Sequence, residues 1–64
     1  MRIGTIISLP DAYSRFGRIK DDDGGAYTVD PSDIPSSTSM GDRFAYKVEL
    51  TSGDGGLAYG LTED

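Results

Sequence analysis

Residues 43–51 read Arg-Phe-Ala-Tyr-Lys-Val-Glu-Leu-Thr, and apolar side chains occupy every second position. A period of two is typical of a β-strand with one buried face, and no apolar stripe recurs at the spacings of three and four that a helix requires. The face expected to be buried carries Phe44, Tyr46, Val48 and Leu50. The opposite face would carry Arg43, Ala45, Lys47, Glu49 and Thr51. This stretch therefore places the chain among the β proteins.

The residues that follow predict a hairpin. Residues 52–56 read Ser-Gly-Asp-Gly-Gly, which is typical of a flexible turn with Asp54 in solvent. Residues 57–61 alternate again and predict a further strand. Gly60 lies inside that strand, where a glycine indicates a bulge or a close approach of another backbone.

Three more strands are predicted in the N-terminal half. Residues 2–9 are rich in β-branched side chains and end at Pro10, and residues 16–20 and 26–30 form two shorter segments. The segment 21–25, Asp-Asp-Asp-Gly-Gly, predicts a tight turn whose glycines supply the positive φ angle that such turns need. A polar connection over residues 31–39 then leads to the strand that begins after Gly41 and Asp42.

Five short strands in 64 residues predict one domain, spanning residues 1–64. Closure into a small barrel would remove the exposed strand edges. The predicted fold is therefore all-β: a small five-stranded antiparallel Greek-key barrel, the OB-fold. An SH3-like barrel is the alternative.

The composition argues against an enzyme and against a cofactor. The chain has no Cys and no His, so it lacks the usual zinc ligands and the commonest nucleophile and base pairs. The acidic run Asp21, Asp22 and Asp23 lacks the spacing of a calcium loop and is interpreted as a solvated turn. No apolar run is long enough to span a bilayer and no signal peptide is evident, so a cytoplasmic protein is expected.

The net charge of −5 opposes binding to a phosphate backbone. One local cluster runs against that trend: Arg15 and Arg18 flank Phe16, and Lys20 follows two positions after Arg18. A guanidinium group can stack on a base and can also contact a phosphate. The basic cluster is therefore the candidate site for a nucleic acid.

Several segments, in the same order and spacing, resemble the bacterial cold-shock proteins. They are Gly4-Thr5-Ile6, Phe16-Gly17-Arg18-Ile19, residues 26–30 with Ile34, residues 41–48, and the glycine-rich turn with the last strand, residues 53–61. The match covers nearly the whole chain, with about one extra residue before Phe16. The resemblance implies an OB barrel that binds single-stranded RNA or DNA on a platform of aromatic rings. OB domains of the initiation-factor and ribosomal S1 type are similar as well.

Much of that aromatic platform is replaced here. Positions at which the family carries platform groups are Ser8, Leu9, Arg18, Val29 and Asp30 in this chain. The resemblance leaves two rings, Phe16 and Tyr27, which are expected to form a small stacking pair on the outer face. The predicted function is weak binding of single-stranded nucleic acid, in which Phe16 and Tyr27 stack on bases while Arg15, Arg18 and Lys20 hold the backbone.

Two other interpretations remain open. The acidic surface could serve a protein-interaction or regulatory module that has kept the barrel, lost nucleic-acid binding and recognises a basic protein partner. The long connection over residues 31–39 could also act as a hinge, so that the chain is either a monomer or a strand-swapped dimer.

Overall fold

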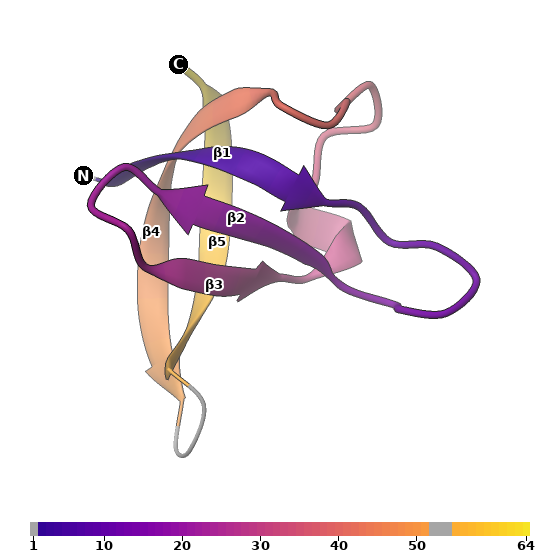
Figure 1. The fold of residues 1–64 in the computed structure, drawn as a ribbon, viewed down its shortest axis with the longest axis horizontal. Helices are drawn as coiled ribbons and strands as arrows, with labels where there is room; N and C mark the ends of the chain where they lie inside the picture. The colour runs from indigo at the N-terminus through magenta and orange to yellow at the C-terminus, as the bar shows by residue number, and fades with distance from the viewer. Residues whose placement is uncertain (1, 52–54) are drawn as a thin grey trace.

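The computed structural model describes residues 2–51 and 55–64. Its elements are β1 (Arg2–Ser8), β2 (Gly17–Asp21), β3 (Ala26–Val29), the 3₁₀ turn η1 (Pro31–Asp33), β4 (Arg43–Thr51) and β5 (Gly55–Glu63). The strands form a closed barrel in the order β1-β2-β3-β5-β4 (Figure 1). The prediction of a small, closed, five-stranded β-barrel is therefore confirmed. The expected turn at Ser52, Gly53 and Asp54 lies outside the described residues.

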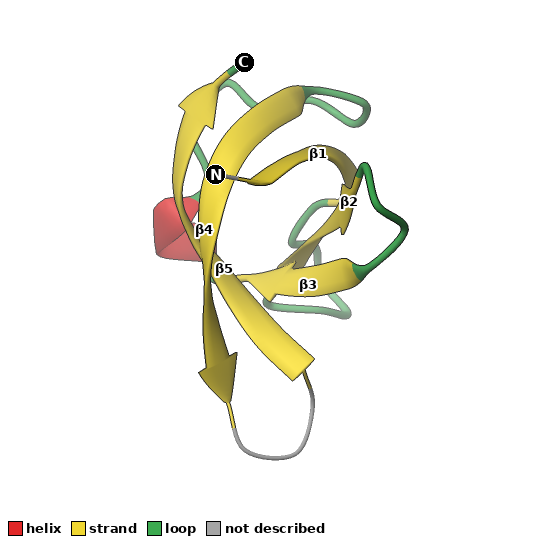
Figure 2. Cartoon of the chain, turned by 90° about the vertical axis from the view of Figure 1, so that its left-hand side faces the viewer, coloured by secondary structure: helices red, strands yellow, loops and turns green. Residues whose placement is uncertain are grey.

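The expectation that all strand pairs are antiparallel is wrong at one seam. β1 pairs antiparallel with β2 and β4, β2 with β3, and β4 with β5, whereas β3 and β5 run parallel. The reason is topological: β3 and β5 are joined through η1 and β4, and such a crossover connection returns the chain in the same direction. Figures 1 and 2 show β1, β2 and β3 on one side of the barrel and the long β4–β5 pair on the other.

The barrel interior is filled by a few side chains from all five strands. The buried cluster consists of Ile6, Ile19, Val29, Phe44, Tyr46 and Ala58. Phe44 and Tyr46 thus point inward as predicted, and Val48 packs against the cluster. Leu50 was predicted to be buried with them, but its side chain is 82% exposed. The pairing of β4 with β1 extends only from Arg43 to Tyr46, so the far end of β4, which carries Leu50, runs on beyond the part that β1 covers.

In strand β5, the alternation of inward and outward side chains is interrupted at Gly60. Ala58 is fully buried and Tyr59 is exposed, whereas Leu61 packs against the core cluster. Between them Gly60 adopts a φ of +65°, and the register with β4 shifts between the pairs Ala45↔Thr62 and Lys47↔Tyr59. The bulge predicted at Gly60 is confirmed, and it reverses the alternation that residues 57–61 display in the sequence.

Candidate nucleic-acid interface

A row of three exposed side chains follows the outer face of β2. Along this strand Gly17, Ile19 and Asp21 are buried, whereas Arg18 and Lys20 are exposed. Phe16 precedes the strand, continues the same alternation and is 43% exposed. We call Phe16, Arg18 and Lys20 the β2 row. The sequence prediction placed these three residues in one site, and the barrel brings them onto one face.

Small side chains border the β2 row on both sides. Arg18 is paired with Thr28 on β3 and with Ser8 on β1. Lys20 is paired with Ala26 and Thr5 on the same two strands. These neighbours are short, and the side chains of Arg18 and Lys20 are exposed beside them.

Two exposed hydrophobic residues lie at the Phe16 end of the face and were not identified from the sequence. Ile7 is exposed at the irregularity in β1, where the register with β2 shifts between Ile6 and Ser8. Met40 is exposed in the segment that approaches β1, since the Gly41 amide donates a hydrogen bond of 2.9 Å to the Ile6 carbonyl. A bulge within a β-branched run leaves no signal that would have identified Ile7.

Two of the other cations are neutralised by carboxylates. The Arg2 guanidinium lies 3.2 Å from an Asp23 oxygen, and Arg43 lies 2.7 Å from Asp22. The pKa of Arg43 is raised, first because its guanidinium donates to Asp22. Arg18 and Lys20 take part in no ion pair among residues 2–51 and 55–64. The β2 row therefore carries two positive charges without a carboxylate bound to either.

Arg15 lies in the loop before the row, and its charge acts on the Asp30 carboxylate. The Asp30 side chain accepts hydrogen bonds from the Ser32 amide, at 2.9 Å, and from the Ser32 hydroxyl, at 2.7 Å. These bonds are the main reason that the pKa of Asp30 is lowered, and the charge of Arg15 adds to the effect. Arg15 thus contributes a partly screened positive charge at the Phe16 end of the row.

Tyr27 does not join the β2 row, and the predicted outer stacking pair with Phe16 is wrong. On β3, Tyr27 is paired with the inward-facing Ile19, and its half-buried ring lies 6.2 Å from the ring of Tyr46. The Arg2 guanidinium covers the ring at 5.4 Å from its centroid. A Cβ atom at Gly56 would approach Tyr27 Cδ1 to 2.9 Å, so the glycine provides the space that the ring occupies.

The acidic turn contains a buried carboxylate, contrary to the prediction that all three aspartates are solvated. Asp22 and Asp23 are exposed, but Asp21 is 7% exposed. Its Oδ2 accepts a hydrogen bond of 2.5 Å from the Tyr46 hydroxyl, and its Oδ1 accepts one of 3.0 Å from the Asp23 amide. The bond from Tyr46 is the main cause that lowers the pKa of Asp21. Burial, together with this carboxylate, raises the pKa of Tyr46 well above its usual range. The role of Asp21 is structural, because it ties the β2–β3 turn to the core.

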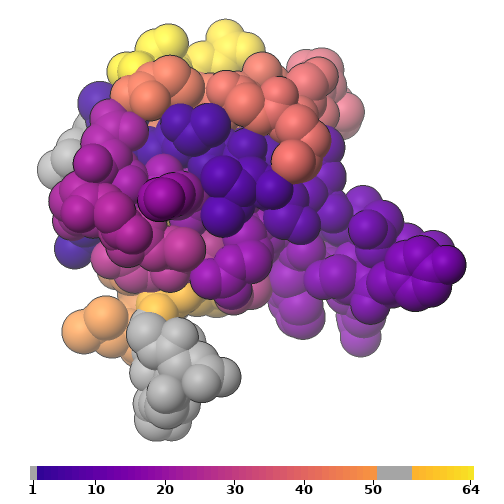
Figure 3. All heavy atoms as spheres, in the orientation of Figure 1, coloured from indigo at the N-terminus to yellow at the C-terminus, as the bar shows by residue number. Residues whose placement is uncertain are grey.

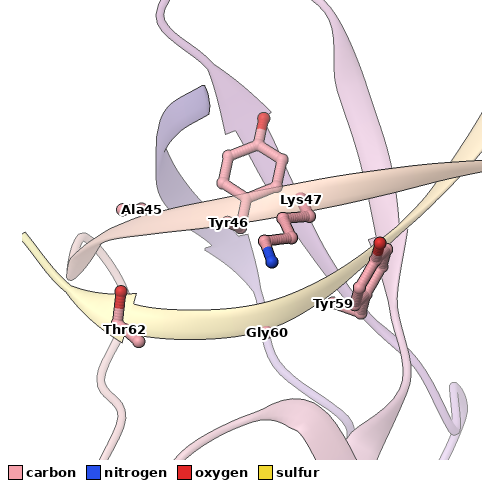
Figure 4. A pocket seen from close by; sticks show the side chains of 6 residues that line it. All are labelled: Ala45, Tyr46, Lys47, Tyr59, Gly60 and Thr62. Carbon is pink, nitrogen blue, oxygen red and sulfur yellow. The ribbon is translucent and has the colours of Figure 1, made fainter. Parts of the chain in front are cut away.

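A hollow of about 220 Å³ lies on the outer face of β4 and β5, across the barrel from the β2 row (Figure 4). It is lined by Ala45, Tyr46, Lys47, Tyr59, Gly60 and Thr62. The Gly60 bulge opens it, since an added Cβ at this glycine would meet no atom within 4 Å. Figure 4 shows the Tyr46 ring and the Lys47 side chain leaving β4 on opposite sides, so that Lys47 alone brings a charge to the hollow.

Metal-binding clusters and membrane-spanning helices were sought in the described ranges. Among residues 2–51 and 55–64, no group of three or more acidic, histidine or cysteine side chains is arranged to hold a metal ion. Within the same ranges no helix is long and apolar enough to cross a membrane. In comparisons with known proteins, no family model matches the chain and no curated protein matches it.

Proposed function

We propose that the protein binds single-stranded nucleic acid weakly, through the β2 row and Arg15. The observation that carries this proposal is the alignment of one exposed ring with two cations that have no ion-pair partner among the described residues. An aromatic ring provides a stacking surface for a base of any identity, and the cations provide contacts to the phosphates. The proposed binding surface does not include Tyr27, because its ring packs against the core.

The size of the site sets the expected affinity. Stacking on one ring contributes about 1 to 3 kcal/mol, and each phosphate contact adds an electrostatic increment that salt weakens. The net charge of −5 repels the phosphate backbone and so weakens the electrostatic contribution. We therefore expect a dissociation constant on the order of 100 μM at low salt, at the weak end of the range for non-specific binding.

Replacement of both cations of the row should abolish most of this affinity. In the double variant Arg18→Ala, Lys20→Ala we expect at least a tenfold weaker binding of labelled oligo-dT and oligo-U, measured by fluorescence anisotropy. Because each phosphate contact on a single strand contributes about 0.7 to the slope of log K against log salt, the slope should fall by about 1.4. Phe16→Ala should weaken binding by roughly fivefold or more through loss of stacking.

Two variants provide matched controls. Lys47→Ala removes a cation that also has no ion-pair partner among the described residues but lies on β4, across the barrel from the row. Tyr27→Phe changes the ring that faces inward. Both should bind as the parent does. If Lys47→Ala weakened binding as much as the loss of a β2 cation, binding would reflect net charge alone. Absence of binding by the parent at several hundred micromolar protein would refute the proposal.

A second candidate function is recognition of a basic protein partner. It is favoured by a hollow of about 210 Å³ lined by Asp42, Arg43, Glu63 and Asp64. Arg43 is already paired with Asp22 and with Asp64, which leaves an excess of negative charge around the hollow. Affinity capture from a lysate of the source organism, with and without nuclease, separates the two functions. Partners that persist after nuclease treatment, and that are lost in Glu63→Lys, would support the protein partner.

A further inference from the structure

The connection between β1 and β2 is a folded loop that projects from the barrel (Figure 1). Its tip is closed by the Asp11 side chain, whose Oδ1 accepts hydrogen bonds from the amides of Tyr13, at 2.8 Å, and Ser14, at 2.9 Å. The Asp11 amide donates in turn to the Ser14 carbonyl at 2.8 Å. The Ser14 hydroxyl donates to the Phe16 carbonyl at 3.2 Å, which ties the tip to the start of the β2 row. The backbone of the tip is thus held in one arrangement before any ligand arrives.

This loop presents an aromatic ring to solvent. Tyr13 is 99% exposed, the highest value among the large hydrophobic side chains that are exposed in the described residues. The space-filling view shows the loop standing clear of the rest of the molecule (Figure 3). Tyr13 therefore contributes nothing to the core, while its backbone amide is fixed in the turn. Because the backbone under the ring is already ordered, binding has only the side-chain torsions of Tyr13 left to fix, which favours its use as an anchor.

The loop also joins Tyr13 directly to the start of the proposed interface, through the Ser14 hydroxyl that donates to the Phe16 carbonyl. It precedes Phe16 by three residues, with Arg15 between them, and Ile7 and Arg18 lie at the same end of the barrel face. The order of chemical groups along this path is ring, cation, ring, cation, cation: Tyr13, Arg15, Phe16, Arg18 and Lys20. A segment that carries both rings and cations suits a polymer that offers both planar bases and phosphates.

We propose that Tyr13 is a second stacking ring, which extends the binding surface beyond the barrel and lengthens the single strand that the protein holds. The inference rests on the proposed function. The β2 row spans about 13 Å, given a rise of roughly 3.3 Å per strand residue, and three further residues reach at most about 10 Å more. The row alone therefore covers a shorter single strand than the row with Tyr13, so a short and a long oligonucleotide distinguish the two parts of the site.

The test compares two lengths of the same oligonucleotide. Tyr13→Ala is expected to bind oligo-dT of four nucleotides within twofold of the parent, because that length is covered by the β2 row. Its affinity for oligo-dT of eight nucleotides should fall about fivefold or more, through the loss of one stacked base. Tyr13→Phe keeps a ring and should retain the parent affinity for both lengths. Since Tyr13 packs against nothing, the circular dichroism spectrum and the melting temperature of each variant should match the parent.

A second readout uses the absence of tryptophan from the chain. In Tyr13→Trp the indole is the sole tryptophan, and its emission should be quenched by the eight-nucleotide strand and unchanged by the four-nucleotide strand. Equal effects of Tyr13→Ala on both lengths, or no effect on either, would overturn the inference even while the double variant Arg18→Ala, Lys20→Ala still loses binding. If the parent binds neither length, the proposed function fails and Tyr13 fails with it, which is a distinct result.

Discussion

Replacing Gly4 with alanine is expected to unfold the barrel. A Cβ atom at this position would lie 2.6 Å from the Lys20 carbonyl oxygen and 3.0 Å from Ile19 Cγ1. β1 cannot move away, because Gly4 is paired with Asp21 on one side and with Phe44 on the other. Overpacking of this kind costs about 3 kcal/mol, which is comparable to the whole stability expected of a domain of this size without a disulfide or metal. Thermal and urea melts followed by circular dichroism should show a largely unfolded chain at 25 °C.

Gly25→Ala is the control for this experiment. A Cβ atom there would lie 3.3 Å from the Tyr27 hydroxyl oxygen and 3.5 Å from Asp23 Oδ1, both at the ends of side chains that can shift. Its melting temperature should therefore stay within a few degrees of the parent. A Gly4→Ala protein that melts close to the parent would show that β1 and β2 can separate without loss of the fold, contrary to the register described above.

Replacing Tyr46 with phenylalanine is expected to destabilise the protein by about 2 kcal/mol at neutral pH. The substitution keeps the ring in the core but removes the hydroxyl that donates to the buried Asp21 carboxylate. Without the Tyr46 hydroxyl, the buried Asp21 carboxylate lacks this hydrogen bond. Hydrogen bonds to charged groups contribute more to stability than those between neutral groups. Urea denaturation at pH 7, with Tyr59→Phe as a control at an exposed ring, measures the difference.

The same variant predicts a change in the response to acid. The pKa of Asp21 is lowered in the folded state, first by the hydrogen bond from Tyr46. A carboxyl whose folded pKa lies below its unfolded value near 3.9 stabilises the protein fully above that value, and this stability is lost as the pH falls through the folded pKa. Tyr46→Phe removes the largest cause of the shift. The stability gap between parent and variant should therefore narrow as the pH is lowered from about 6 toward 2.

Asp30 shows why the variant should remain sensitive to acid. Its pKa is also lowered, through hydrogen bonds from Ser32 that Tyr46→Phe does not touch. Parent and variant should both lose this contribution in the same pH range, so only the gap between them reports on Asp21. A gap of constant size from pH 6 to pH 2 would contradict the account of the Tyr46 and Asp21 pair.

The alternation in residues 43–51 was enough to predict a barrel strand, but not the extent of its buried face. Phe44 and Tyr46 lie in the core because β1 covers that part of β4. Leu50 has the same pattern and is exposed, because β4 runs on after its pairing with β1 has ended. The alternation of apolar side chains predicts that a segment is a strand. Whether a given side chain of that strand is buried depends on how far the neighbouring strand extends alongside it.

Only part of the candidate site could be predicted from the sequence, because some of its side chains are placed by contacts with distant segments. Arg18 and Lys20 follow the period of β2, so their common face could be derived from the sequence. Tyr27 was placed on the wrong face because its position depends on space made available by Gly56, a residue 29 positions further along the chain. The burial of Asp21 depends in the same way on the reach of the Tyr46 side chain. Contacts between distant segments of this kind leave no local signal.

The parallel seam between β3 and β5 has a consequence for how the barrel opens. It is defined by two register pairs, Thr28↔Leu57 and Val29↔Ala58, whereas β4 and β5 are joined by a much longer ladder. A seam held by so few paired residues needs little to be broken before it opens locally. The amide protons of the β3–β5 seam should therefore exchange with deuterium ahead of those in the centre of the β4–β5 hairpin.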